Sequence, residues 1–288
     1  MPIKTILVPM NAAQSDSVTL DLALMVARRT NAHIQALFVR PDPKDIALYA
    51  GFGPEGLGLG RLMDQVEQEG AEMSARARKA YDAWCARNDV GEAQKAEPAS
   101  RVTAAWREVL GAVDLIIPRA GGLCDLVVET GIQDRDFALE ETSIEASLFG
   151  SARPTLIAPK TLPSRLDATA LIAWNGSREA NHAVHAALDM LATCHQVAIF
   201  CQPEGARSQA DPADLVAFLG SHGIKAHPVA AAQTGASVGA DVLATAAREQ
   251  ATLLVMGGYT HGRLREMVLG GVTHHVIHHA SIPVLLAH

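Results

Sequence analysis

The sequence predicts an α/β protein made of two doubly wound domains, each built on a parallel sheet. Residues 5–27 match residues 169–191 without a gap, and this match aligns Asn11 with Asn175. Each copy reads as an apolar strand, a polar turn and then apolar residues at helical spacing. Apolar runs and helical patterns alternate through the second half as well. Such alternation produces βαβ units with right-handed crossovers and parallel sheets.

The ends of the two halves also match, and this match suggests the domain boundary. ARPTLIAP at 152–159 resembles SIPVLLAH at 281–288, so each half opens and closes with a short apolar strand. We therefore assign residues 1–160 to a first domain and residues 168–288 to a second. A length of 288 residues fits two domains of ordinary size.

The remaining elements follow in order between these ends. The first half is expected to have a strand at 32–39, one long helix at 61–88 and a further strand at 125–131. In the second half the expected elements are a strand at 195–201, a helix at 211–223, a strand at 224–230, a helix at 239–250 and a strand at 251–258. The glycine-rich stretch 51–60 reads as a surface loop by default, with a lid or a partner-binding loop as the alternatives.

Composition and charge exclude several classes of protein. The chain is 49% hydrophobic and 19% charged, which is typical of a soluble globular protein, and its formal net charge is −7. No extended basic run is present, so we expect neither a nucleic-acid partner nor a membrane partner. The opening MPIKTILVPM does not read as a signal peptide, and the four cysteines form no CxxC pair. A cytoplasmic protein with reduced thiols is therefore expected.

The segment MGGYTHGRLREMVLGGVT, at 256–273, carries the functional signal. In an open parallel sheet, ligands bind beyond the carboxyl ends of the strands. Gly257 and Gly258 leave a strand at such an end, where they allow a sharp turn and a close approach of the backbone to a ligand. Gly270 and Gly271 then introduce a helix, whose first-turn N–H groups favour an anion.

The same segment resembles the signature of the universal stress protein family, Gly-x2-Gly-x9-Gly-Ser/Thr. Gly257 takes the position of the first Gly, Thr260 that of the second, Gly270 that of the third and Gly271 that of the Ser/Thr. In members of the family that bind ATP, this loop wraps the phosphates and the ribose. The resemblance therefore implies a phosphate-binding loop with two departures, at Thr260 and at Gly271.

The resemblance covers both halves of the chain. ILVPMN at 6–11 and LIAWNGSREA at 171–180 resemble the opening strand of the family, and HHASIPVLLAH at 278–288 resembles its closing helix and strand. The implied architecture is a tandem universal stress protein, similar to the adenine nucleotide alpha hydrolase fold, whose two domains form an internal pseudo-dimer. In single-domain relatives the closing strands pair across a dimer, so here they are expected to pair within one chain. Association of two chains as a homodimer stays open.

The resemblance also implies a ligand, ATP or another adenine nucleotide with Mg²⁺, bound in the second domain. Asn175 stands where the family has an Asp, so a carbonyl acceptor is kept and the charge is lost. The residues carried over by position are Ala173, Asn175, Gly257, Thr260, Gly270, Gly271 and Val272. Four further residues join the expected site, Gly258 from the turn, Thr273 from its closeness in sequence, and Arg263 and Arg265 from their charge.

The first half departs most from the signature. DLVVETG is followed by IQDRDFALEETSIEASLFGS, which is acidic and lacks the paired glycines. Its carboxylates are expected to repel a triphosphate. They are Glu129, Asp134, Asp136, Glu140 and Glu141. At most one nucleotide site is therefore expected, in the second half.

Other constellations have simpler explanations. His274 with His278 and His275 with His279 have the i, i+4 spacing that lets two imidazoles share a metal, but no Cys, Asp or Glu flanks them closely. A solvated or interface cluster of histidines is expected rather than a metal site. Ser177 is expected to cap the helix that follows it.

We expect a stress-response protein that binds a nucleotide and acts as a regulatory or protective factor. No catalytic residue is nominated, and slow ATP hydrolysis is the most that we expect. One alternative is a non-nucleotide scaffold or small-molecule sensor whose first-half loop recognises a protein partner. Another is a hydrolytic or transfer enzyme of the wider adenine-nucleotide-binding fold, which the absence of a base or metal triad disfavours.

Overall fold

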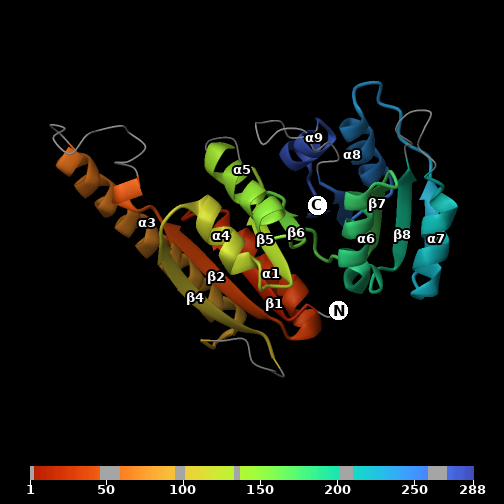
Figure 1. Cartoon of the computed structure of the whole chain (residues 1–288). Coiled ribbons are helices and arrows are strands. Elements are labelled where there is room, and N and C mark those ends of the chain that lie inside the picture. Colours follow the sequence, from red (N-terminus) through yellow and green to blue (C-terminus); the bar gives the residue numbers. More distant parts are fainter. Residues whose placement is uncertain (1–2, 46–58, 95–100, 133–136, 202–209, 259–270) are drawn as a thin grey trace. The chain divides into compact units, whose positions relative to one another are not determined.

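A computed structural model describes residues 3–45, 59–94, 101–132, 137–201, 210–258 and 271–288 (Figure 1). These residues divide into two compact units. The first unit consists of Ile3–Thr130 and Glu141–Ser151, and the second contains Gly131–Glu140 and Ala152–His288. None of the described helices is long and apolar enough to cross a membrane.

The first unit is a parallel sheet with the strand order β3-β4-β2-β1-β5. Its elements are β1 (Thr5–Met10), α1 (Asp16–Thr30), β2 (His33–Arg40), α3 (Leu59–Asn88), β3 (Gly91–Glu92), β4 (Thr103–Leu110), α4 (Val113–Gly121), β5 (Leu126–Thr130), the part of α5 (Phe137–Glu145) that begins at Glu141, and the π-helix η1 (Ala146–Gly150). Helix α1 packs against β1, β2 and β5, and α4 packs against η1. The central strands are nearly all apolar because helices cover both faces of such a sheet.

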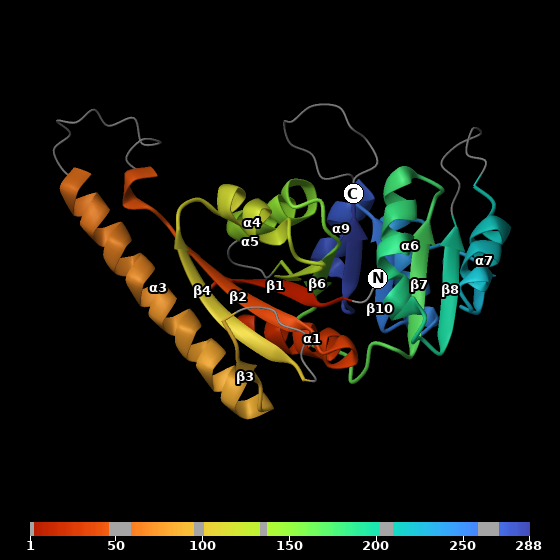
Figure 2. The ribbon, with the colours of Figure 1, turned by 60° about the horizontal axis from the view of Figure 1, so that its bottom comes forward.

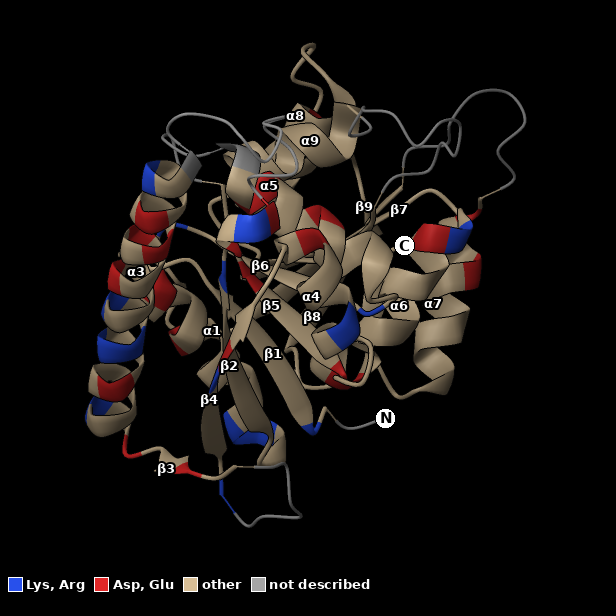
Figure 3. Ribbon diagram, turned by 60° about the vertical axis from the view of Figure 1, so that its left-hand side comes forward, with Lys and Arg blue, Asp and Glu red and all other residues tan. Residues whose placement is uncertain are grey.

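Helix α3 is the long helix expected at 61–88. Figure 3 shows Lys, Arg, Asp and Glu interspersed along it, and Arg78 pairs with Asp82 one turn away, with Nε and Oδ1 2.8 Å apart. Tyr81 and Trp84 are buried, and the Trp84 Nε1–H donates to Asp21 Oδ1 at 2.8 Å. The charged residues therefore form a solvated face, while the aromatic residues fix the helix to the unit.

The second unit has the strand order β6-β11-β10-β7-β8-β9. Its elements are β6 (Thr155–Ala158), β7 (Thr169–Trp174), α6 (Arg178–Leu191), β8 (Gln196–Cys201), α7 (Pro212–Ser221), β9 (Ala226–Val229), α8 (Val238–Arg248), β10 (Leu253–Gly257), α9 (Gly271–His279) and β11 (Val284–Ala287). All neighbouring strands of this unit are parallel except β6 and β11, which are antiparallel. Figure 2 shows α6 beside β7, and this helix also packs against β10 and β11.

The antiparallel pair confirms that the two closing strands meet within one chain. Leu285 of β11 is paired with Leu156 of β6. This pairing is also the reason why residues 152–160, which the sequence assigns to the first domain, group with the second unit. An apolar antiparallel pair of this kind buries both strands on both faces, and all four residues of each strand are buried.

The strand order of the second sheet reverses at β7, between the parallel neighbours β7 and β10. The chain runs from β7 to β8 and β9 on one side of β7, and then returns to place β10 on the other side. Such a reversal leaves a crevice beyond the carboxyl ends of the two central strands. The strands β7 and β10 are therefore the elements that position a ligand site.

Candidate functional site

The carboxyl ends of β7 and β10 are adjacent in the sheet. Ala173 is paired with Met256 in parallel register, so the residues that follow each strand leave the sheet side by side. Ala173, Asn175, Gly257 and Gly258, four of the residues expected to line the nucleotide site, therefore come from neighbouring strand ends.

Asn175 shapes the turn between β7 and α6. Its Oδ1 accepts a hydrogen bond from the Ser177 backbone N–H at 3.1 Å. Ser177 in turn caps α6, because its Oγ accepts from the Ala180 N–H at 3.1 Å, which confirms the expected cap. Gly176 between them has a φ of 76°, a left-handed conformation that favours glycine. The carbonyl oxygen of Asn175 is thus engaged in the turn, and its NH2 group is the part that can serve a ligand.

Trp174, the last residue of β7, belongs to the core. It is 9% exposed, and its indole Nε1–H donates to Asn181 Oδ1 at 2.8 Å. This bond ties the strand end to the first turns of α6. The ring therefore holds the turn in place, which is consistent with a core role for this tryptophan.

Gly257 is required by packing inside the protein. A Cβ at this position would lie 2.6 Å from the Ala180 backbone nitrogen and 2.8 Å from the Glu179 carbonyl carbon. Real Cβ atoms do not approach backbone so closely, so a side chain here would push α6 away from β10. The next residue, Gly258, donates its N–H to the Ala287 oxygen at 2.8 Å and continues the sheet by one step.

The start of α9 forms the third side of the expected site. Gly271 is exposed, and a Cβ added to it would meet no atom within 4 Å. Val272 is half-buried and Thr273 is buried. The expected residues Thr260, Arg263, Arg265 and Gly270 lie outside the described residues. Gly257 and Gly271 therefore differ. A side chain at Gly257 would clash with α6, whereas a side chain at Gly271 would meet none of the described residues.

Comparison with known families agrees with this architecture. Residues 169–288 match the sequence model of the universal stress protein family. The second half of the chain is therefore similar to a universal stress protein domain. No curated protein matches the chain by sequence.

Solved structures extend the fold to the whole chain. A universal stress protein from Archaeoglobus fulgidus shares 18% sequence identity at a TM-score of 0.68, and the match covers 98% of this chain and 95% of that one. A functionally unknown protein from Pseudomonas aeruginosa shares 15% identity at a TM-score of 0.56, covering 99% and 92%. The cytoplasmic domain of a prokaryotic cation chloride cotransporter shares 10% sequence identity at a TM-score of 0.50, and the match covers 99% of this chain and 95% of that one. The chain therefore has the universal stress protein fold in tandem.

The first unit has the equivalent turn, but it is built differently. Asn11 aligns with Asn175, yet its backbone N–H donates to Asp16 Oδ1 at 3.0 Å. Asp16 is 1% exposed, and burial raises the pKa of its carboxyl to about 6. Within the described residues, Asn11 Nδ2 and Asp16 Oδ2 are buried without a hydrogen-bond partner. The sequence gives little sign of this buried carboxyl, because acidic residues near a helix start are ordinarily solvated.

Glu129 of β5 is enclosed in the first unit. It is 1% exposed, and its carboxylate accepts hydrogen bonds from Ser143 Oγ at 2.9 Å and from Ser147 Oγ at 2.5 Å. The two serines lie on α5 and η1, one turn apart. From the sequence, Glu129 is expected to be one of several carboxylates that repel a triphosphate. In the structure its carboxylate is buried and hydrogen-bonded to two serines. Asp134 and Asp136 lie outside the described residues.

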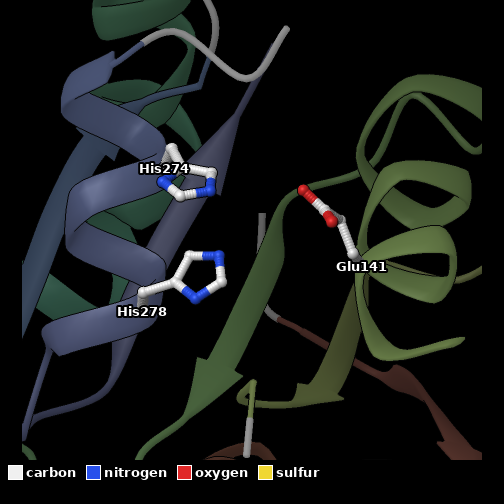
Figure 4. Close-up of side chains that lie close together, drawn as sticks. All are labelled: Glu141, His274 and His278. Atoms are coloured by element: carbon white, nitrogen blue, oxygen red, sulfur yellow. The ribbon is translucent and has the colours of Figure 1, made fainter. Parts of the chain in front are cut away.

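The histidines of α9 form two pairs of neighbouring rings, of which His275 with His279 is stacked and His274 with His278 is tilted. The ring centroids of His274 and His278 are 4.1 Å apart, and those of His275 and His279 are 4.4 Å apart. Figure 4 shows His274 and His278 on successive turns of the helix. Burial, with a smaller contribution from the neighbouring imidazoles, lowers the pKa of His275. The hydrogen bond of His279 Nδ1 with the His275 oxygen, at 2.8 Å, occupies one ring nitrogen of the second pair.

Proposed function

We propose that the second unit binds an adenine nucleotide beyond the carboxyl ends of β7 and β10. The observation that carries the proposal is the adjacency of these two strand ends at the point where the strand order reverses. The chain between β10 and α9 carries the signature-like sequence MGGYTHGRLREMVLGG. A strand end, this signature-like sequence and a helix start therefore follow one another along the chain, which is the order found in phosphate-binding sites.

Two groups in the described residues suit such a ligand. The amide NH2 of Asn175 is a donor toward a base or a ribose, since its oxygen is held by Ser177. The backbone N–H groups at the start of α9 favour a phosphate, and the open space around Gly271 lets one approach. The expected Mg²⁺ would accompany the phosphates.

The biological role that we propose is regulatory. Occupancy of the site biases a conformation or the choice of a protein partner, as expected of a stress-response factor, and turnover of ATP is at most slow. The cytoplasm is the expected location.

Native mass spectrometry tests binding directly. The gently purified protein is measured alone and after titration with ATP, ADP and AMP, with and without Mg²⁺. One saturable nucleotide per chain supports the proposal. Absence of binding at millimolar nucleotide would favour a scaffold or small-molecule sensor.

One observation favours that alternative enough to keep it. Gly257 and the oxygen of Asn175 are both explained by contacts inside the protein, with Ala180 and with Ser177. A chain that has lost its nucleotide would still need both features in order to fold. The presence of Gly257 and Asn175 therefore does not distinguish the two functions. A measurement of nucleotide binding does.

A further inference from the structure

A cavity of about 590 Å³ lies beside α6, and all of the residues that line it belong to the second unit. Three segments line the cavity: one face of α6, the end of β11 and the residues that lead into β6. The lining residues are Ala152, Arg153, Pro154, Arg178, Asn181, His182, His185, Ala186, Ala287 and His288. The size is that of a site for a small organic molecule.

The ionisable residues of this lining are all basic in type, although the protein carries a formal net charge of −7. They comprise two arginines and three histidines, and no Asp or Glu is among the lining residues. Arg178 has an exposed side chain, and its Nε lies 3.7 Å from Glu179 Oε1, which is longer than a hydrogen bond. The guanidinium of Arg178 therefore keeps donors for a ligand.

Hydrogen bonds orient two side chains of the lining. The Oδ1 of Asn181 accepts from Trp174, so its NH2 group is available as a donor. The Nδ1 of His182 lies 3.2 Å from the backbone oxygen of His288, and a carbonyl can only accept, so this nitrogen carries the proton. The ring of His182 is thereby held in one orientation, and in the neutral ring its Nε2 is an acceptor.

The remaining lining residues supply an apolar wall. Ala152, Pro154, Ala186 and Ala287 have no polar side-chain atoms. A bare inorganic ion would leave most of a cavity of this size unfilled, whereas a molecule with an oxyanion head and a compact apolar body would use both parts of the lining. Guanidinium groups match the oxygen geometry of both phosphate and carboxylate.

We propose that this cavity is a second ligand site, separate from the nucleotide site, for a small organic oxyanion: a phosphate monoester or a carboxylate on a compact apolar body. Arg178 and Asn181 bind the oxyanion, the oriented ring of His182 forms part of the wall, and the alanines and proline contact the body. The proposal does not depend on the nucleotide function.

Calorimetric titration of the full chain with phenyl phosphate, benzoate and inorganic phosphate tests it. Saturable binding of phenyl phosphate or of benzoate, one per chain and tighter than that of inorganic phosphate, is expected, and the better of the two identifies the head group. Arg178→Gln is expected to weaken that binding at least about tenfold, because a charged hydrogen bond is lost. The control is Arg76→Gln, which removes an exposed arginine of α3 and is expected to leave the affinity unchanged.

Three results would overturn the proposal. The first is that neither organic anion binds saturably to the unaltered protein. The second is that Arg178→Gln and Arg76→Gln bind the anion with equal affinity, and the third is that AMP displaces the anion competitively. Failure of AMP to bind at all would count against the nucleotide function and leave this site standing. Circular dichroism of each variant checks that the fold is kept.

Discussion

Gly257 at the end of β10 lies against the first turn of α6, so closely that a Cβ would come within 2.6 Å of the Ala180 backbone nitrogen. The backbone of a capped helix cannot yield as a flexible side chain can. The contact therefore fixes the distance between the end of β10 and the first turn of α6. A glycine that the signature assigns to ligand binding therefore has a structural role as well.

Gly257→Ala is expected to destabilise the second unit by about 2 kcal/mol, since overpacking forces backbone to shift. Unfolding in urea, followed by circular dichroism, measures the change. The matched control is Gly220→Ala in α7, where a Cβ meets no atom within 4 Å and a small gain in stability is expected. Equal effects at the two positions would contradict the packing explanation.

Asn181→Ala is expected to cost about 1 to 2 kcal/mol, because the buried indole N–H of Trp174 loses its acceptor. Asn181→Asp keeps an acceptor at the same place and serves as the control. Urea unfolding gives the free energies, and the tryptophan emission spectrum reports the altered surroundings of the ring. Equal losses in the two variants would show that the hydrogen bond does not matter.

Asp16 makes the first unit sensitive to pH. Burial raises the pKa of its carboxyl from 3.8 to about 6, so the folded state holds the proton more tightly than the unfolded state. Protonated Asp16 therefore stabilises the folded state relative to its ionised form. This contribution to the free energy of unfolding is fully present below pH 3.8, is lost as the pH rises to about 6, and does not change further above that pH. Integrated over this window, the shift corresponds to about 3 kcal/mol.

Asp16→Asn keeps an oxygen for the Asn11 N–H and cannot ionise. Unfolding free energies of the two proteins are compared at several values between pH 4 and pH 7. The stability of the unaltered protein relative to the variant is expected to fall up to about pH 6 and then to level off. A relative stability that rises with pH would mean that the carboxyl is not buried in this way.

Ser143→Ala is expected to destabilise the first unit by about 2 kcal/mol, because the buried carboxylate of Glu129 loses a donor. The comparison is Ser221→Ala, which removes an exposed hydroxyl at the end of α7. Thermal unfolding of both variants measures the difference. Similar melting temperatures would show that Ser143 does not support the buried charge.

The periodic parts of the fold were predictable from the sequence. The repeat located β1 and β7, and helical spacing located α3 to within two residues of its observed start. The pairing of β6 with β11 was expected from the resemblance to the universal stress protein family, in whose single-domain members the closing strands pair across a dimer.

The remainder depends on tertiary contacts that leave little trace in the sequence. A glycine pair at a strand end looks the same whether a ligand or a helix backbone lies next to it, so the role of Gly257 needed the position of α6. Asp16 and Glu129 look like solvated acids, because burial is decided by elements far away in the chain. Thr260, Arg263, Arg265 and Gly270 stay predictions, because they lie outside the described residues.

Nucleotide binding by the second unit is measured most directly by calorimetric titration of Mg²⁺ and ATP, ADP or AMP into the unaltered protein and two matched variants. Gly271→Leu and Gly220→Leu each place the same side chain on a helical glycine that has open space around it. The former covers the start of α9, and the latter changes α7, away from the strand ends. One nucleotide per chain is expected for the unaltered protein and for Gly220→Leu, with binding at least about tenfold weaker in Gly271→Leu. Equal affinities in the two variants, or no binding to the unaltered protein at millimolar nucleotide, would contradict the proposed nucleotide site.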